Sequence, residues 1–468
     1  MPVSHALSPQ AIALNRFGLG ASPGAAPDNP RGWLLDQFAR FEPRSAGFAA
    51  LPDAGAMVTA YQAERRMERQ NQPAANTPGV KDPALLAARQ DYGQQVQALY
   101  RAAVQARSDA ALQTQAPFIE RMVHFWSNHF CVSVDNQPVT AYAGSFERDA
   151  IRTHVLGRFE DMAMAVEHHP AMLIYLNQNQ SIGPGSMAAQ RSRLGGDPAR
   201  RRGLNENLAR EIMELHTLGV RSGYTQADVT EFARALTGWT VGGQDSDRPG
   251  NFLFRDRQHE PGARRILGKT YHQEGEHQAR AALADFTHAP ATATHIATKL
   301  ARHFAGDTPP PAMVARLAGV FTSSGGDLPT LYKALIDSPE AWLPQPLKFK
   351  TPWEWTISAL RGLGRGETGA IQMAAVQRQL GQPVWKPGSP AGWDDVSASW
   401  IAPDALMRRV EFAQRLVSPL GDQIDARALA PRLLPASLDP ATAGQVAMAE
   451  SPASALALLL VSPDFLRR

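Results

Sequence analysis

Apolar residues recur at every third or fourth position along most of the chain, and runs that alternate between apolar and polar residues are few. The first spacing places apolar side chains on one face of a helix, whereas strict alternation is typical of a strand. The pattern therefore predicts one helix after another. We predict helices at roughly 8–16, 31–41, 53–70, 83–107, 115–130, 140–156, 204–218, 225–237, 275–286, 291–305, 311–322, 328–337, 351–363, 403–416 and 452–460.

Start signals sharpen the boundaries of some of these helices. Thr225, followed three residues later by Asp228, is a variant of the capping box, in which two side chains satisfy backbone N–H groups at a helix start. Ser338 and Ser451 each precede a proline, the arrangement in which serine caps a helix and proline occupies its first position. We expect helices to begin at these three places.

Three segments break the helical rhythm. Residues 177–203 are polar, contain glycine and are rich in arginine, which predicts a long loop. The strings FLFRDR and RRILGKTY flank a turn-forming HEPGA and favour a β-hairpin near 250–272. Residues 381–402 combine Pro and Gly with three Trp and predict an ordered irregular loop. The predicted fold class is therefore mainly α, a multi-helix orthogonal array with one small β-hairpin.

Composition and charge narrow the class of protein. The 468 residues are 44% hydrophobic and 19% charged, which is typical of a globular chain. The net charge of +3 excludes a broad basic surface, so we expect no nucleic-acid binding. Cys131 is the single cysteine, which excludes an intrachain disulfide and a Cys-rich zinc site.

The apolar segments are too short to cross a membrane. The longest, 453–461, has about nine residues, whereas a bilayer needs about 20. The first twenty residues lack the charged and apolar regions of a secretory signal. We therefore expect no membrane span and a cytoplasmic protein.

Two histidines in the predicted helix 115–130 point in different directions. At 100° per residue, His129 shares the apolar face of Phe118 and Phe125, whereas His124 lies roughly 140° away. The two cannot bind one ion as the histidines of an HExxH helix do. His129 is predicted to face the core, either as a histidine satisfied by hydrogen bonds or as part of a site.

The predicted helix 204–218 carries a continuous polar stripe. Glu206, Arg210 and Glu214 follow one another at four-residue spacing, and Asn207 and Glu211 extend the stripe on the adjoining side. One interpretation is a solvated surface held by salt bridges. The other is a partly buried site in which Glu211, Glu214, Arg210 and His129 are catalytic and Asn207 and Glu206 bind substrate.

Such a cluster could work in two ways. Two carboxylates beside an arginine and a histidine can act as general acid and base. Alternatively, the carboxylates and a histidine could hold a divalent metal ion. The arginines just before the stripe, Arg200, Arg201 and Arg202, could bring an anionic group of the substrate to the helix start; their other interpretation is a solvated loop.

Seven segments together resemble a bacterial family, catalogued as domain of unknown function 1800. The segments are ALNRFGLGAS (13–22), RMVHFWSNHF (121–130), HPAMLIYLNQNQS (169–181), NENLAREIMELHTLGVRSGYTQADVTEFARALTGWT (205–240), HEPGARRILGKTY (259–271), KFKTPWEW (348–355) and GQPVWKPGSPAGW (381–393). The resemblance spans nearly the whole chain and implies one large helical domain over 1–468, from which we expect a helical hairpin at 51–114 to project. It supplies no catalytic residues.

The resemblance also bears on partners and location. Relatives are often encoded beside a sulfatase-like protein, and many carry an export signal, so export stays open. Two functions remain: a hydrolase or transferase that acts on a polar or anionic substrate through the Glu/Arg/His cluster, and a non-catalytic helical scaffold or maturation partner of a sulfatase-like protein.

Overall fold

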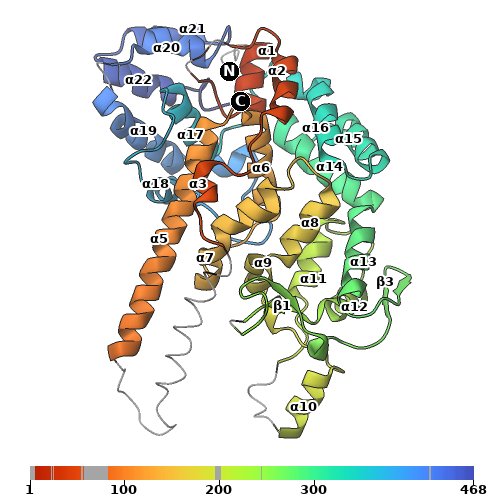
Figure 1. Cartoon of the computed structure of the whole chain (residues 1–468). Helices are drawn as coiled ribbons and strands as arrows, with labels where there is room; N and C mark the ends of the chain where they lie inside the picture. The colour runs from red at the N-terminus through yellow and green to blue at the C-terminus, as the bar shows by residue number, and fades with distance from the viewer. Residues whose placement is uncertain are drawn as a thin grey trace.

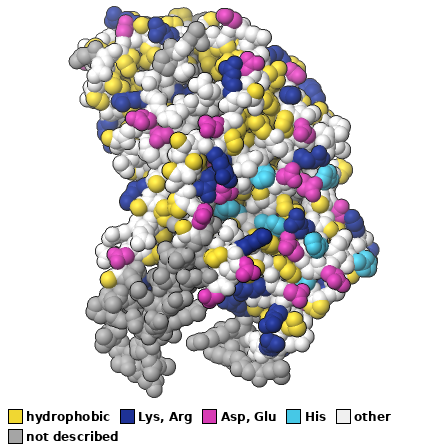
Figure 2. Space-filling model, in the orientation of Figure 1, with side chains coloured by type: hydrophobic (Ala, Val, Ile, Leu, Met, Phe, Trp, Pro, Cys, Tyr) yellow, Lys and Arg dark blue, Asp and Glu magenta, His cyan; other side chains and the backbone are white. Residues whose placement is uncertain are grey.

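The computed structural model describes residues 6–22, 24, 26–53, 56, 83–195, 202–243, 245–420 and 423–468. In this part of the chain the fold is mainly α, as predicted, with 60% helix and two small antiparallel sheets of two strands each (Figure 1). None of the helices in these ranges combines the length and apolar character needed to cross a bilayer. Charges of both signs are interspersed on the face drawn in Figure 2.

Most of the predicted helices are present. The α-helices are α1 (Pro9–Ile12), α2 (Pro30–Asp36), α3 (Ala46–Ala49), α5 (Pro83–Gln113), α6 (Pro117–His129), α7 (Gln137–Phe146), α8 (Phe159–His168), α9 (Pro170–Tyr175), α10 (Met187–Gly195), α11 (Asn207–Glu211), α12 (Gln226–Leu236), α13 (Glu276–Thr287), α14 (Pro290–Ala305), α15 (Pro311–Ser323), α16 (Leu328–Asp337), α17 (Pro352–Gly362), α18 (Met373–Gln379), α19 (Pro403–Val417), α20 (Ala426–Leu433), α21 (Pro440–Ala447) and α22 (Pro452–Leu460). The π-helical segments are η1 (Ala13–Phe17), η3 (Glu147–Arg152) and η6 (Ile212–His216). The 3₁₀ turns are η2 (Gln37–Ala39), η4 (Gln178–Gln180), η7 (Asp256–Gln258), η8 (Pro339–Trp342), η9 (Ser397–Trp400) and η10 (Ser418–Leu420). Helices α8, α9, α18, α20 and α21 fall in none of the predicted ranges, and most of the predicted helix at 53–70 lies outside the described residues.

Capping chemistry explains several helix starts. The predicted capping box at Thr225 and Asp228 is present at the start of α12, and Ser451 caps α22 through its side chain. A second capping box, Thr351 with Glu354, opens α17. Each cap satisfies backbone N–H groups that have no partner inside the helix. The cap at Thr351 also fixes Glu354 at the edge of the cavity described below.

The strand region differs in detail from the prediction. β1 (Trp239–Val241) pairs with β2 (Phe252–Phe254), and β3 (Arg264–Ile266) pairs with β4 (Lys269–Tyr271). Leu267 and Gly268 join β3 to β4 and both have positive φ, the geometry of a tight two-residue hairpin turn. A hairpin near 250–272 is therefore confirmed, but FLFRDR pairs with the segment before it rather than with RRILGKTY.

Two further predictions are corrected or only partly described. Residues 187–195 of the predicted 177–203 loop form α10, whose Met, Ala, Gln, Arg and Leu side chains are good helix formers. Residues 196–201 lie outside the described residues. Of the predicted hairpin at 51–114, helix α5 is described and projects from the body in Figure 1, whereas residues 57–82 lie outside the described part.

Among the described residues, the hydrophobic core consists of two large clusters and a small third one at Phe48, Ala106 and Ala110, and the N-terminal segment joins the two large clusters. Ile12 and Phe17 belong to the cluster built around α6, whereas Leu14 and Leu19 belong to the cluster around α17 and α22. Because neighbouring side chains of one short segment enter both clusters, the two cores meet at η1. The organisation as one domain remains a prediction.

The last residues run antiparallel to the segment before α17, with a bridge between Phe349 and Arg467. The amide of Lys350 donates to the carbonyl of Leu466 at 2.8 Å, and the amide of Arg468 donates to the carbonyl of Lys348 at 2.9 Å. This pairing buries the Arg468 side chain in the interior, beside α17.

Candidate functional site

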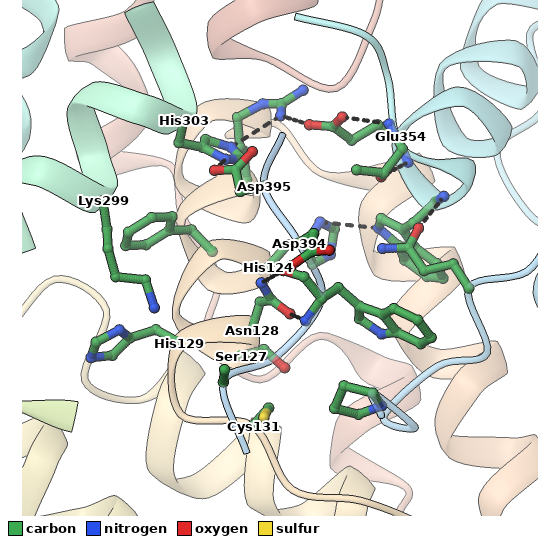
Figure 3. Close-up of a pocket in the computed structure, with 18 of the residues that line it drawn as sticks. His124, Ser127, Asn128, His129, Cys131, Lys299, His303, Glu354, Asp394 and Asp395 are labelled. Atoms are coloured by element: carbon green, nitrogen blue, oxygen red, sulfur yellow. Dashed lines mark hydrogen bonds and ion pairs between the residues drawn. The ribbon is translucent and has the colours of Figure 1, made fainter. Parts of the chain in front are cut away.

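A cavity of about 500 Å³ lies between α6 and α14, with the start of α17 and the loop 382–395 as its other walls (Figure 3). Its lining is unusually rich in nitrogen-bearing side chains and indole rings. The polar and aromatic lining includes His124, His129, His295, His303, Arg107, Arg121, Lys299, Arg302, Cys131, Asn128, Glu354, Asp394, Asp395, Trp353, Trp385 and Trp393.

Helical spacing brings these groups together. On α14, His295, Lys299 and His303 follow at four-residue intervals, so they share one face. On α6, Arg121, Phe125 and His129 do the same, and residues 124 and 128 flank them. Both faces line the cavity, so two rows of basic and aromatic side chains oppose each other across it.

At one end of the cavity the charges are fully paired. Glu354 forms ion pairs with Arg121 and, at 3.0 Å, with Arg468. Its other oxygen accepts the backbone N–H of Thr351 at 2.9 Å. Burial alone would raise the pKa of Glu354, but the two guanidinium charges outweigh burial and hold that pKa well below its usual range. Glu354 is therefore an ionised carboxylate between two buried arginines.

His303 continues this paired network. Its Nδ1 lies 2.9 Å from a carboxylate oxygen of Asp395, and its Nε2 lies 3.4 Å from Arg121. Lys348 pairs with the other oxygen of Asp395 at 3.0 Å and with Asp307 at 2.9 Å. Burial lowers the pKa of His303, so the neutral ring donates from Nδ1 to Asp395 and accepts from Arg121 at Nε2. This network holds the cavity wall in place, and both ring nitrogens of His303 have a partner.

Lys299 and Arg302 contrast with this network. Within the described residues, neither side chain has a hydrogen bond or an ion pair, and the Nε atom of Arg302 is buried without a partner. Burial is the main cause that lowers the pKa of Lys299 to about 8. Two cations without a carboxylate partner inside a cavity form a site with affinity for an anion.

Two histidines that line the cavity form hydrogen bonds with the end of η6. His129 Nε2 lies 3.1 Å from the carbonyl oxygen of His216, and His295 Nε2 lies 3.0 Å from that of Leu215. Both carbonyls are at the end of η6, where no further turn of helix supplies donors. Nε2 of His129 therefore carries the hydrogen, and its buried Nδ1 keeps a lone pair without a partner in the described part of the chain.

Cys131 also lines the cavity, but as a thiol. Its Sγ donates to the carbonyl of Pro390 at 3.1 Å. Burial raises the pKa of this thiol to about 12, so it is not a thiolate at neutral pH. The side chain packs the loop 382–395 against the end of α6, in line with a packing role.

The predicted polar stripe lies on α11 and η6. Arg210 pairs with Glu206 at 3.4 Å and with Glu214 at 3.7 Å, and its side chain is 36% exposed. Gln226 and Thr230 of α12 also donate to the Glu206 carboxylate, at 2.7 and 2.6 Å. The three charged residues thus form a partly exposed, paired network.

The other predicted residues do not gather into one pocket. Asn207 and Arg202 are exposed, and Arg200 and Arg201 lie outside the described residues. His129 lines the cavity, whereas the residues of the stripe do not. Glu211 lies between the two regions: its charge contributes to the raised pKa of Cys131, and burial raises its own pKa.

Sequence reasoning missed most of the cavity, including Lys299, Arg302, His303, Glu354 and Asp395. One signal was available, since His295, Lys299 and His303 repeat at helical spacing in a helix that was correctly predicted. No group of three or more His, Cys, Asp and Glu among the described residues is arranged to hold a metal ion, so the predicted divalent metal has no site there.

The comparisons with known proteins concern the whole chain. The model of the family described as "Protein of unknown function (DUF1800)" matches residues 12–467. The chain belongs to this family. No curated protein and no solved structure matches the chain. Membership in DUF1800 confirms the resemblance found in the sequence, and the family description names no reaction.

Proposed function

We propose that this DUF1800 chain is an enzyme of the hydrolase or transferase class that binds an anionic substrate in the cavity between α6 and α14. Lys299 and Arg302 bind the anionic group, and the indole rings of the cavity surround the rest of the substrate. One observation carries the proposal: these two cations have no partner in the described residues, whereas Arg107 and Arg121 of the same cavity are paired with Glu147 and Glu354.

Two partly buried cations without an ion-pair partner support ligand binding because they lower the stability of the protein when no ligand is bound. Moving an ammonium or guanidinium group out of water lowers stability unless a counter-charge compensates. Surface salt bridges such as that of Arg210 carry no comparable cost. A site retained at the expense of stability is typical of function.

The predicted acid and base groups fit this location in part. His129 offers a buried Nδ1 lone pair at the cavity wall, and its pKa is held well below the usual range mainly by burial, so the neutral ring can accept a hydrogen bond from the substrate. Glu211 does not line the cavity, so it does not reach a substrate bound there in this proposal. Glu214 and Arg210 act, in this proposal, as the supporting surface network.

Isothermal titration calorimetry with phosphate, sulfate and small carboxylates tests the anion site. We expect one class of anion to bind, and Lys299→Met or Arg302→Met to weaken its affinity by roughly 10- to 100-fold, the value of a lost charged hydrogen bond. Lys333→Met, at an exposed lysine of α16, is the matched control and should bind as the parent does. Equal affinity in all three variants would contradict the proposal.

The alternative function is the non-catalytic scaffold or maturation partner of a sulfatase-like protein. The ion pairs of Arg210 in the stripe favour this alternative, because charges that pair with one another stabilise the fold and need no substrate. It would gain support if none of these anions bound at millimolar concentration and a sulfatase-like protein co-purified with the chain. Loss of that complex on Arg210→Ala would assign the stripe to the interface.

A further inference from the structure

Lys299 differs from the other lysines that the structure describes. Four of them have polar partners: Lys269 with Asp285, Lys348 with Asp307 and Asp395, Lys350 with Asn15, and Lys386 with Asp135. Lys333 is exposed on the surface. Lys299 is the one whose amine lines the cavity and has no partner among the described residues.

The surroundings of Lys299 suit a reactive amine. Its charge contributes to the lowered pKa of His129 and of His295. Burial lowers its own pKa more than Cys131 and Asp395 raise it, and Arg302 lowers that pKa further, so its amine lies among these groups. In Figure 3 the Lys299 side chain points toward His129. With a pKa of about 8, roughly a tenth of the amine is neutral at pH 7.

We propose that Lys299 is a nucleophile that forms an imine with a substrate carrying both a carbonyl and a carboxylate, such as a 2-oxo acid, whose carboxylate Arg302 binds. The inference rests on the anion site proposed above and narrows its substrate class. Arg302 lies one helical turn after Lys299, so it can hold a carboxylate beside a carbonyl that meets the amine. Burial of an amine next to another cation is an established way to activate it.

The step needs no oxidant or reductant. The lone pair of Lys299 Nζ forms a bond to the carbonyl carbon, and the carbonyl π electrons move to oxygen. A proton passes from nitrogen to that oxygen, and the unpaired Nδ1 of His129 is the group that relays it. A second proton, which replaces the one that the ammonium form of Lys299 releases to water before the attack, lets the hydroxyl leave as one molecule of water and gives the protonated imine. The imine then withdraws electrons from a bond at the adjacent carbon, which favours transfer chemistry over hydrolysis.

Reductive trapping on the full chain tests this inference. The protein is treated with pyruvate and cyanoborohydride at neutral pH, and the adducts are located by peptide mass spectrometry. We expect Lys299 to react at least about tenfold faster than exposed Lys333, since each unit by which an amine pKa falls raises its neutral fraction about tenfold. Equal or slower labelling of Lys299 would overturn the inference.

Two variants separate this inference from the anion site. Lys299→Arg keeps the charge but cannot form an imine, so it should bind pyruvate in calorimetry and give no adduct in that peptide. Arg302→Met should slow labelling of Lys299 by pyruvate but not by propionaldehyde, which lacks a carboxylate. If the parent binds pyruvate and Lys299 is not trapped, the imine is refuted and the anion site stands. If pyruvate and propionaldehyde label Lys299 equally and Arg302→Met changes neither rate, the substrate class is refuted.

Discussion

Two regions of the molecule concentrate charged side chains: the stripe on α11 and η6, and the cavity between α6 and α14. In the stripe, Arg210 lies between Glu206 and Glu214, and solvent reaches all three. In the cavity, Lys299 and Arg302 are partly buried and form no ion pair within the described residues, although the charge of Asp395 acts on Lys299. Charged side chains therefore stabilise the surface of the protein in the stripe, whereas in the cavity they create a site that can bind an anion.

The cavity itself has two parts with opposite energetics. Around Glu354 and Asp395 each buried charge has a partner of opposite sign, which makes that part rigid. Around Lys299 no ion pair forms among the described residues, and the charge of Asp395 compensates the ammonium only in part. A preorganised anion site requires this arrangement, in which a rigid wall of ion pairs lies beside two cations that form no ion pair.

The largest expected effect is on the paired wall. Glu354→Gln leaves Arg121 and Arg468 buried without a counter-charge, so we expect the free energy of unfolding to fall by about 3–5 kcal/mol in urea titrations. Glu206→Gln, which breaks a partly exposed pair, is the control and should cost below about 1 kcal/mol. Similar losses in both variants would remove the contrast between the two regions.

The contribution of Glu354 to stability should also depend on pH. Because the folded pKa of Glu354 is lowered, its stabilising contribution is fully present above the ordinary glutamate pKa of about 4.3 and is lost as pH falls toward the folded value. The difference in stability between the parent and Glu354→Gln should therefore shrink below about pH 4.

Lys299 should oppose stability. We expect Lys299→Met to raise the free energy of unfolding by about 1–2 kcal/mol at pH 7, because a desolvated ammonium is replaced by an apolar side chain of similar length. The gain is fully present below the folded pKa of about 8 and declines as pH rises toward the unfolded value. Urea titrations at pH 7 and at a pH well above 8 check this expectation. A loss of stability would show that Lys299 is structural.

Anion affinity should depend on the same proton. Above the Lys299 pKa of about 8 the amine loses its charge, so affinity should weaken by up to about tenfold for each pH unit. Of the neighbouring groups, His129 and His295 stay neutral because their pKa values are lowered, the raised pKa of Cys131 is about 12, and Asp395 stays ionised because its pKa is lowered. Lys299→Arg should flatten the profile. An unchanged slope in that variant would assign the proton elsewhere.

The smallest effect is expected on the stripe. Arg210→Ala should change the free energy of unfolding by less than about 1 kcal/mol, and it should leave anion affinity unchanged, because its pairs are partly solvated and do not line the cavity. Thermal and calorimetric measurements on one preparation give both values. A large loss of affinity would return the binding site to the stripe.

Much of the fold could be predicted because its signals are local. The apolar spacing predicted α6, α12, α14 and α22 to within a residue or two, and the capping box at Thr225 fixed the start of α12. Helix α10 was missed because its glycine and arginine neighbours resemble a loop in composition. The inward position of His129 followed from helix geometry alone.

The candidate site could be predicted only in part, because its contacts join distant segments. Arg121 meets Glu354 across 233 positions, and His303 meets Asp395 across 92. Pairing at such separations is set by how helices pack, and periodicity within one helix says nothing about which face another helix covers. The stripe of α11 was favoured because its charges are neighbours in sequence, and that same closeness lets them pair with each other.

The sequence by itself determined the helical class, most helix boundaries, the family and the inward direction of His129, because each depends on residues within a few turns of one another. Only the tertiary structure decided which charges are compensated. A cation can bind an anionic ligand only if no carboxylate already forms an ion pair with it. That depends on how α6, α14, α17 and the loop 382–395 pack against one another.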